Sequence, residues 1–116
     1  MSFKPGQIYW ANFGGTGDRP VVIVSREELN RCNYVVVVPV TSARFEERSK
    51  MRNCVPFYAG DFGLTKDCVA QTEVITFLEI TELDQQIGLI GELGEIAVRN
   101  LVKAIGYMIS SECEPV

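Results

Sequence analysis

The chain has 116 residues, enough for one compact domain, and 47% of them are hydrophobic, enough for a buried core. The net charge of −4 argues against a non-specific nucleic-acid binder, although a local basic patch remains compatible with it. No apolar run reaches the roughly 20 residues that cross a bilayer, and the N-terminus lacks the apolar core of a secretory signal. We therefore expect a single cytoplasmic domain over residues 1–116, with no membrane association.

The cysteines of the chain are scattered, and it has no histidine. Zinc sites usually need close pairs of Cys or His, and no CxxC pair occurs among Cys32, Cys54, Cys68 and Cys113. Without a secretory signal, a disulfide framework is not expected either. The sequence therefore predicts no metal and no cofactor, with the cysteines acting as small apolar side chains.

Short β-prone runs dominate the first two-thirds of the chain, separated by segments rich in glycine, aspartate and asparagine. The second run is apolar without interruption, which favours burial on both of its faces. Pro39 cannot donate a ladder hydrogen bond, so we expect it at an edge or a bulge. The predicted strand regions are Ile8–Phe13, Pro20–Ser25, Tyr34–Thr41, Cys54–Tyr58 and Asp67–Phe77.

Two polar segments connect these regions. Residues 26–33 are interpreted as a turn or a short helical turn, and residues 43–53 as a mobile loop. The second segment carries a basic cluster, diluted by neighbouring glutamates, which is more typical of a solvated loop than of an RNA-binding patch. Its members are Arg44, Arg48, Lys50 and Arg52.

Apolar residues after position 93 recur at spacings of three and four, which predicts an amphipathic helix. Gly91 or Gly94 is expected to precede it, and Glu95 with Arg99 forms a favourable i,i+4 pair on its other side. The expected fold is mainly β, a small barrel or strongly bent sheet with a C-terminal helix. The apolar helix positions are Leu93, Ala97, Leu101, Ala104, Ile105 and Met108.

Several blocks, taken in order, resemble the MazF/PemK toxin family over nearly the whole chain. They are Pro5–Phe13, Asp18-Arg19-Pro20 with the apolar run after it, Val38–Ser42, Cys68–Phe77, and Ile87-Gly88 leading into the helix. The resemblance implies an SH3-like barrel of the CcdB/PemK type and a homodimer. It also implies a toxin that cuts single-stranded RNA without a metal and is inhibited by a cognate antitoxin, through the antitoxin's C-terminal segment.

Cleaving RNA in this way requires the ribose 2′-hydroxyl to attack the adjacent phosphate, giving a cyclic phosphate and a 5′-hydroxyl end. Because histidine is absent, the resemblance offers Arg19 and Thr41 as catalytic residues. Arg19 can bond a phosphate bidentately and keeps its charge at any pH, so it suits charge stabilisation better than proton abstraction. Thr41 follows an apolar strand, and its hydroxyl can donate to a phosphate oxygen. Without the resemblance, the two residues read as a surface arginine and an ordinary strand threonine.

The remaining site residues follow from the same blocks. Glu73 is a third catalytic candidate, as the carboxylate of its block, and strand alternation predicts that it shares a face with Gln71. Ile75 departs from the family pattern, which often has a basic residue there, and this puts RNA affinity and retained activity in question. The predicted RNA-binding residues are Asn12, Phe13, Ser42, Gln71 and Thr76.

Two other functions compete with the nuclease. A noncatalytic SH3-like binding module, or a degenerate toxin, is supported by the acidic pI of about 4.8 and by the departures from the family pattern. A gyrase poison of the CcdB group would work through an aromatic residue at its extreme C-terminus, whereas residues 110–116 contain none. Analysis of RNA cleavage products separates the nuclease from both.

Overall fold

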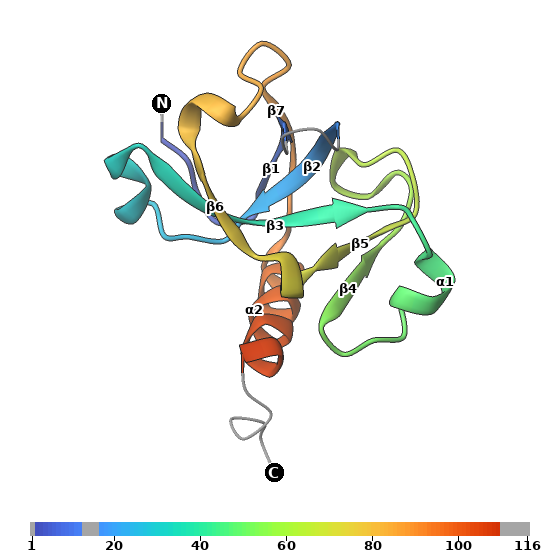
Figure 1. Ribbon diagram of the computed structural model, residues 1–116. Coiled ribbons are helices and arrows are strands. Elements are labelled where there is room, and N and C mark those ends of the chain that lie inside the picture. Colours follow the sequence, from blue (N-terminus) through green and yellow to red (C-terminus); the bar gives the residue numbers. More distant parts are fainter. Residues whose placement is uncertain (1, 13–16, 110–116) are drawn as a thin grey trace.

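The computed structural model describes residues 2–12 and 17–109. Within these residues, seven strands form one antiparallel sheet in the order β4-β5-β3-β2-β1-β7, with β6 pairing with β3 off this path. Figure 1 shows the strongly bent sheet with the helix α2 (Glu95–Ile109) packed across one side of it. The strands are β1 (Gln7–Asn12), β2 (Asp18–Ile23), β3 (Tyr34–Thr41), β4 (Cys54–Phe57), β5 (Cys68–Gln71), β6 (Thr76–Glu79) and β7 (Leu89–Glu92).

The sheet separates two apolar clusters, because the valine-rich strands β2 and β3 bury both of their faces. The first, which we call the helix-side cluster, includes Ile8, Val22 and Val38 and packs against Leu101 of α2. The second, the outer cluster, includes Val21, Val37 and residues from β6 and the N-terminus. Val21, Val22 and Ile23 are all 0% exposed, which confirms the expected burial on both sides.

Pro39 is buried inside the sheet, opposite Val21 of β2. It stands where β3 changes its other neighbour, since β3 pairs with β6 as far as Val37 and with β5 from Val40 onward. The ladder on that edge is therefore interrupted at the residue that lacks an N–H group, which is how a proline is tolerated in an interior strand.

Residues 67–77, expected to be extended, are divided into β5, the 3₁₀ turn η3 (Thr72–Val74) and β6. The Thr72 side chain is fully buried and donates to the Asn53 carbonyl (2.6 Å), which holds the turn. Besides η3 and the later turn η4 (Ile80–Glu82), three short helical elements accompany the strands in the described residues: η1 (Leu29–Cys32), α1 (Phe45–Arg48) and η2 (Asp61–Gly63). The sequence missed α1, β7 and the turn η4.

The C-terminal helix has the expected position and orientation. It begins after Gly94, whose carbonyl accepts the Val98 N–H (3.0 Å), and it buries Leu101 and Ala104 in the helix-side cluster. Arg99 and Glu95 form the expected i,i+4 ion pair at 2.9 Å on its exposed side. Among the described residues, no helix is long and apolar enough to cross a membrane.

Candidate active site

Arg19 and Thr41 lie on one face of the sheet, at the ends of two paired strands. β2 and β3 run antiparallel with Val21 opposite Pro39. Because side chains alternate along a strand, Arg19 shares the face of Val21, and Thr41 shares the face of Pro39. The same register, extended by two residues along each strand, brings Arg19 opposite Thr41. Both side chains are half-buried, so their strands hold them while part of each stays accessible.

Two of the predicted RNA-binding residues belong to the same face. Thr41 pairs with Val69 of β5, so Gln71, two residues further, lies on the face of Thr41. Thr76 pairs directly with Val37 of β3, which shares that face as well. Gln71 is buried and Thr76 is half-buried. The register therefore gathers four of the predicted residues on one surface, which we call the catalytic face.

The other predicted residues do not lie on this face. Asn12 pairs with Asp18, which alternates with Arg19, so Asn12 belongs to the opposite face of the sheet. Ser42 follows Thr41 directly and lines a pocket together with Val40 on that opposite side. The prediction for Phe13 falls outside the described residues.

Glu73 lies in η3, and not on a strand as the alternation argument assumed. It is nevertheless beside Gln71, whose side-chain amide donates to Glu73 Oε2 (3.3 Å). The Asn53 amide donates to the other oxygen, Oε1, at 2.8 Å. Both carboxylate oxygens are thus engaged by neutral donors. Sequence reasoning missed Asn53, because nothing in a polar loop signals that one of its residues will reach the turn after β5.

The charges near this face come from several elements. Within the described part of the chain, neither a hydrogen bond nor an ion pair engages the Arg19 guanidinium. Burial, followed by the nearby Glu73 carboxylate, raises the pKa of the Cys54 thiol, while Arg48 opposes this shift.

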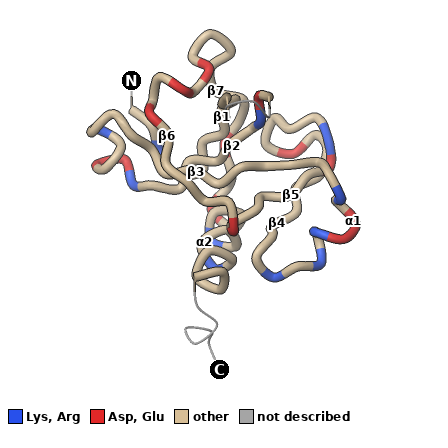
Figure 2. The backbone as a smooth tube through the Cα atoms, in the orientation of Figure 1, with Lys and Arg blue, Asp and Glu red and all other residues tan. Residues whose placement is uncertain are grey.

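Figure 2 shows the basic residues of the predicted cluster along α1 and the turn after it. Arg52 of this cluster lies 4.4 Å above the Tyr107 ring of α2, so the segment is anchored on the helix.

A pocket of about 280 Å³ opens at the same strand ends, on the face opposite the catalytic face. We call it the rim pocket. Its lining includes Trp10 of β1, Asp18 of β2 and Ser42 just after β3, together with residues 63–66 at and after the end of η2. The Cys68 thiol lies at its wall, and burial, with a smaller contribution from Asp67, raises the pKa of this thiol to about 11. The thiol is therefore neutral at physiological pH.

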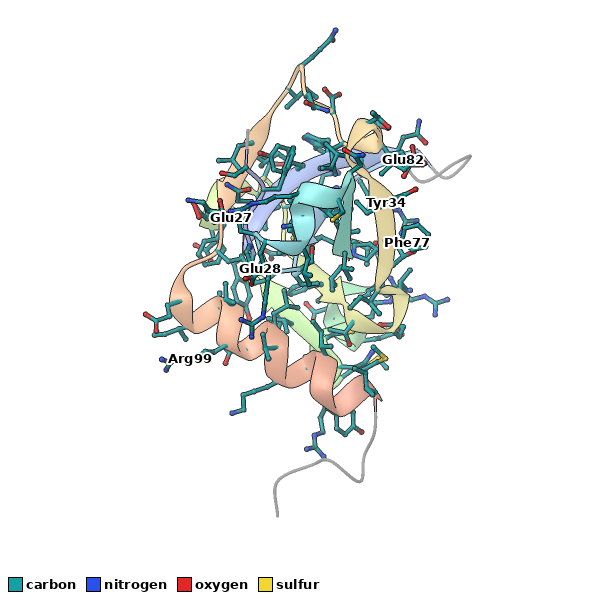
Figure 3. The ribbon with its side chains drawn as sticks, turned by 90° about the vertical axis from the view of Figure 1, so that its left-hand side faces the viewer. Glu27, Glu28, Tyr34, Phe77, Glu82 and Arg99 are labelled. Atoms are coloured by element: carbon teal, nitrogen blue, oxygen red, sulfur yellow. The ribbon has the colours of Figure 1, made fainter. Side chains whose placement is uncertain are left out.

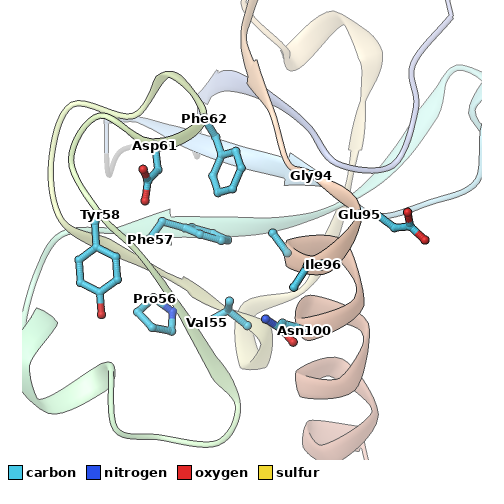
Figure 4. A pocket seen from close by; sticks show the side chains of 11 residues that line it. Val55, Pro56, Phe57, Tyr58, Asp61, Phe62, Gly94, Glu95, Ile96 and Asn100 are labelled. Atoms are coloured by element: carbon cyan, nitrogen blue, oxygen red, sulfur yellow. The ribbon is translucent and has the colours of Figure 1, made fainter.

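A second pocket, of about 560 Å³, lies between β4, η2 and the start of α2. Figure 4 shows its aromatic side, formed by Phe57, Tyr58 and Phe62, facing Ile96 on the helix. Its described lining includes the Asp61 carboxylate and no lysine or arginine. Such a surface is unsuited to phosphate, and it contains none of the residues predicted for the site.

Comparison with known proteins agrees with this architecture. Residues 4–109 match the family described as PemK-like, MazF-like toxin of type II toxin–antitoxin system. An endoribonuclease in complex with its cognate antitoxin, from a mycobacterial species, is similar with a TM-score of 0.76 at 24% identity, over 92% of this chain and 94% of that chain. A search of curated protein sequences finds no match.

Two further solved structures share the fold. The Mycobacterium tuberculosis toxin MazF-mt6 gives a TM-score of 0.74 at 24% identity, covering 89% of this chain and 95% of that chain. A MazE–MazF structure from Deinococcus radiodurans gives 0.73 at 18% identity, covering 95% and 97%. The architecture is therefore the expected SH3-like barrel with a C-terminal helix. Since the family match extends over nearly the whole chain, the protein belongs to the PemK-like, MazF-like toxins of type II toxin–antitoxin systems.

Proposed function

We propose that this toxin is an endoribonuclease that cuts single-stranded RNA at specific sequences without a metal ion. One observation carries the proposal: Arg19 and Thr41 share a face at the ends of two paired strands, and both are partly accessible. A guanidinium and a hydroxyl held on neighbouring rigid strands form a preorganised site for a phosphate. The endoribonuclease named among the structural relatives supports the same activity.

In the proposed reaction the 2′-oxygen forms a bond to phosphorus while the bond to the 5′-oxygen breaks. The products are a 2′,3′-cyclic phosphate and a 5′-hydroxyl, and the proton lost by the 2′-oxygen balances the one gained by the 5′-oxygen. Arg19 binds the non-bridging oxygens and stabilises the charge that grows on them in the transition state. The Thr41 hydroxyl oxygen accepts the Ala43 N–H (3.2 Å), which leaves its hydrogen available for a phosphate oxygen.

Glu73 acts in this proposal as an acceptor that holds its neighbours in position. Its two oxygens already receive the Asn53 and Gln71 amides, and this arrangement orients Gln71 on the catalytic face. Gln71 and Thr76 then contact the RNA beside the reacting phosphate. The alternative is that Glu73 takes the 2′-hydroxyl proton on a remaining lone pair while both amides stay bound.

The toxin is further proposed to act in the cytoplasm as a homodimer that a cognate antitoxin silences with its C-terminal segment. An exposed aromatic pair supports the dimer: Tyr34 on β3 is 46% exposed, Phe77 on β6 is 64% exposed, and their rings lie 5.6 Å apart. Figure 3 shows both side chains together at the outside of the sheet. We expect Phe77→Ser to convert a dimer into a monomer in light scattering after size exclusion, and an unchanged mass would exclude this contact.

The test of the activity is to incubate the purified chain with a mixed-sequence single-stranded RNA in EDTA and to map the ends. Discrete cuts with 5′-hydroxyl ends are expected, and Arg19→Ala and Thr41→Ala should each abolish them. Arg99→Ala is the matched control, because this arginine is exposed on α2 and, among the described residues, forms its ion pair with Glu95. Intact RNA from a folded wild-type protein would refute the nuclease and favour a noncatalytic binding module.

A further inference from the structure

The rim pocket and the catalytic face meet at the same strand ends. On β2, Asp18 and Pro20 line the pocket and flank Arg19. On β3, Val40 and Ser42 line the pocket and flank Thr41. Adjacent residues of a strand are only about 3.3 Å apart along it and point to opposite faces. If the phosphate of a nucleotide lies at Arg19 and Thr41, its base can therefore extend past the strand ends into the rim pocket.

The pocket's chemistry suits a flat polar ring. Trp10 is half-buried and provides an aromatic wall, while Leu64 and Val40 make the interior apolar. Two exposed lining residues, Asp18 and Lys66, carry opposite charges, and within the described residues neither side chain has a hydrogen bond or an ion pair. A carboxylate that accepts and an ammonium that donates can together read the edge of a base.

The wall of the rim pocket formed by η2 and β7 is rigid. A Cβ atom on Gly63 would come within 2.2 Å of the Ile90 carbonyl oxygen, and one on Gly91 within 1.8 Å of the Phe62 carbonyl oxygen. The backbones of η2 and β7 thus touch, and Gly63 also has a φ of +81° that favours glycine. The Asp67 carboxylate accepts the Ala59 N–H (2.9 Å) and closes the base of this loop. The pocket is therefore preformed before any ligand binds.

We propose that the rim pocket binds a guanine base of the RNA, next to the phosphate held by Arg19 and Thr41, and so contributes to sequence specificity. The inference rests on the proposed ribonuclease function. Guanine stacks on Trp10, donates N1–H and the 2-amino group to the Asp18 carboxylate, and accepts at O6 from Lys66. Adenine and cytosine would present a ring acceptor to Asp18. The volume of about 280 Å³ lies at the lower limit of ligand pockets and suits one base better than a longer segment.

Trp10 is the only tryptophan of the chain, so its fluorescence reports on this pocket. We would titrate the full chain with guanosine, adenosine, cytidine and uridine 5′-monophosphates, which contain no internucleotide bond to cut. Guanosine monophosphate should quench the emission with a Kd at least about tenfold lower than the others. Asp18→Asn should remove this preference, whereas the control Asp61→Asn, in the other pocket, should keep it.

Equal responses to all four nucleotides, or none, would overturn the inference. These results are separate from the cleavage assay. Guanosine selectivity with uncut RNA would support the pocket and refute the nuclease, while cleavage without guanosine selectivity would refute the pocket alone.

Discussion

The two ends of the β2–β3 ladder use the same strands for different tasks. At the inner end, Ile23 and Val37 face each other and are 0% exposed, and β6 lies along β3. At the outer end, Arg19 and Thr41 occupy the same face but are only half-buried. Side-chain alternation and strand pairing are the same along the ladder. The two ends differ in how far the rest of the protein buries them. The rigid inner end fixes the strands, and the open outer end presents side chains to a ligand.

The largest effect expected from this comparison concerns the inner end. Ile23→Ala should lower the free energy of unfolding by about 2–5 kcal/mol, because it leaves a cavity in a fully buried site. Urea denaturation followed by circular dichroism measures this loss. Arg19→Ala, four residues earlier on β2, should leave the urea midpoint nearly unchanged. Equal destabilisation by both substitutions would remove the distinction between the two ends.

Thr41→Val tests the outer end with a side chain of nearly the same shape. If the hydroxyl stabilises the transition state, the rate of RNA cleavage should fall by about 10²-fold or more, as on loss of one donor from an oxyanion site. Initial rates on a short fluorogenic RNA measure it, with melting temperature as the control for folding. A rate within a factor of three of the wild type would show that the hydroxyl does not contact the reacting phosphate.

Alkaline pH offers a way to probe the buried wall behind the rim pocket. Burial raises the pKa of Cys68 to about 11 from about 9, so the folded protein keeps a proton that the unfolded chain has lost. Stability from this thiol is therefore complete below pH 9 and should fall by about 2–3 kcal/mol as pH rises from 9 to 11. Cys68→Ala should show a smaller slope of stability against pH over this window, and an identical slope would contradict the assignment.

The smallest expected effect distinguishes a positioning role of Glu73 from a role as base. Glu73→Gln keeps an oxygen that can accept one amide, so we expect cleavage to fall by less than about tenfold, with the pH dependence of the rate unchanged. The rate measured from pH 5 to 9 for both proteins is the readout. A loss of 10²-fold, together with a lost acidic limb, would instead identify Glu73 as the general base.

The sequence predicted those elements whose patterns are local. The valines of β3 and the apolar spacing of α2 depend only on neighbouring residues, and both elements were found where expected. The turn η3 was missed inside a continuous β-prone run, because it depends on a hydrogen bond from Thr72 to the distant Asn53. β7 was missed because it is short and contains Gly91, which is required by contact with the η2 backbone.

The site was predicted only in part, for a similar reason. Arg19 and Thr41 came from the family resemblance, and their common face follows from a strand register that no local pattern specifies. Asn12 was grouped with them because it precedes the first loop, and Ser42 because it follows Thr41, yet alternation directs both to the other face. The rim pocket was not predicted, since its wall depends on η2 meeting β7 across the barrel.

The pairing of β1 with β7 also has a consequence for how this toxin is made. β7 pairs with β1, with Gln7 opposite Glu92. The first strand therefore has no partner on this side until residues 89–92 have been made. Contacts between such distant segments must overcome a large loop-closure entropy, and folds dominated by them reach the native state in milliseconds to seconds. A ribosome adds about 5–20 residues per second, so β1 lacks its β7 partner for several seconds after it has been made. We therefore expect any activity that requires the complete sheet to be absent until β7 has left the ribosome.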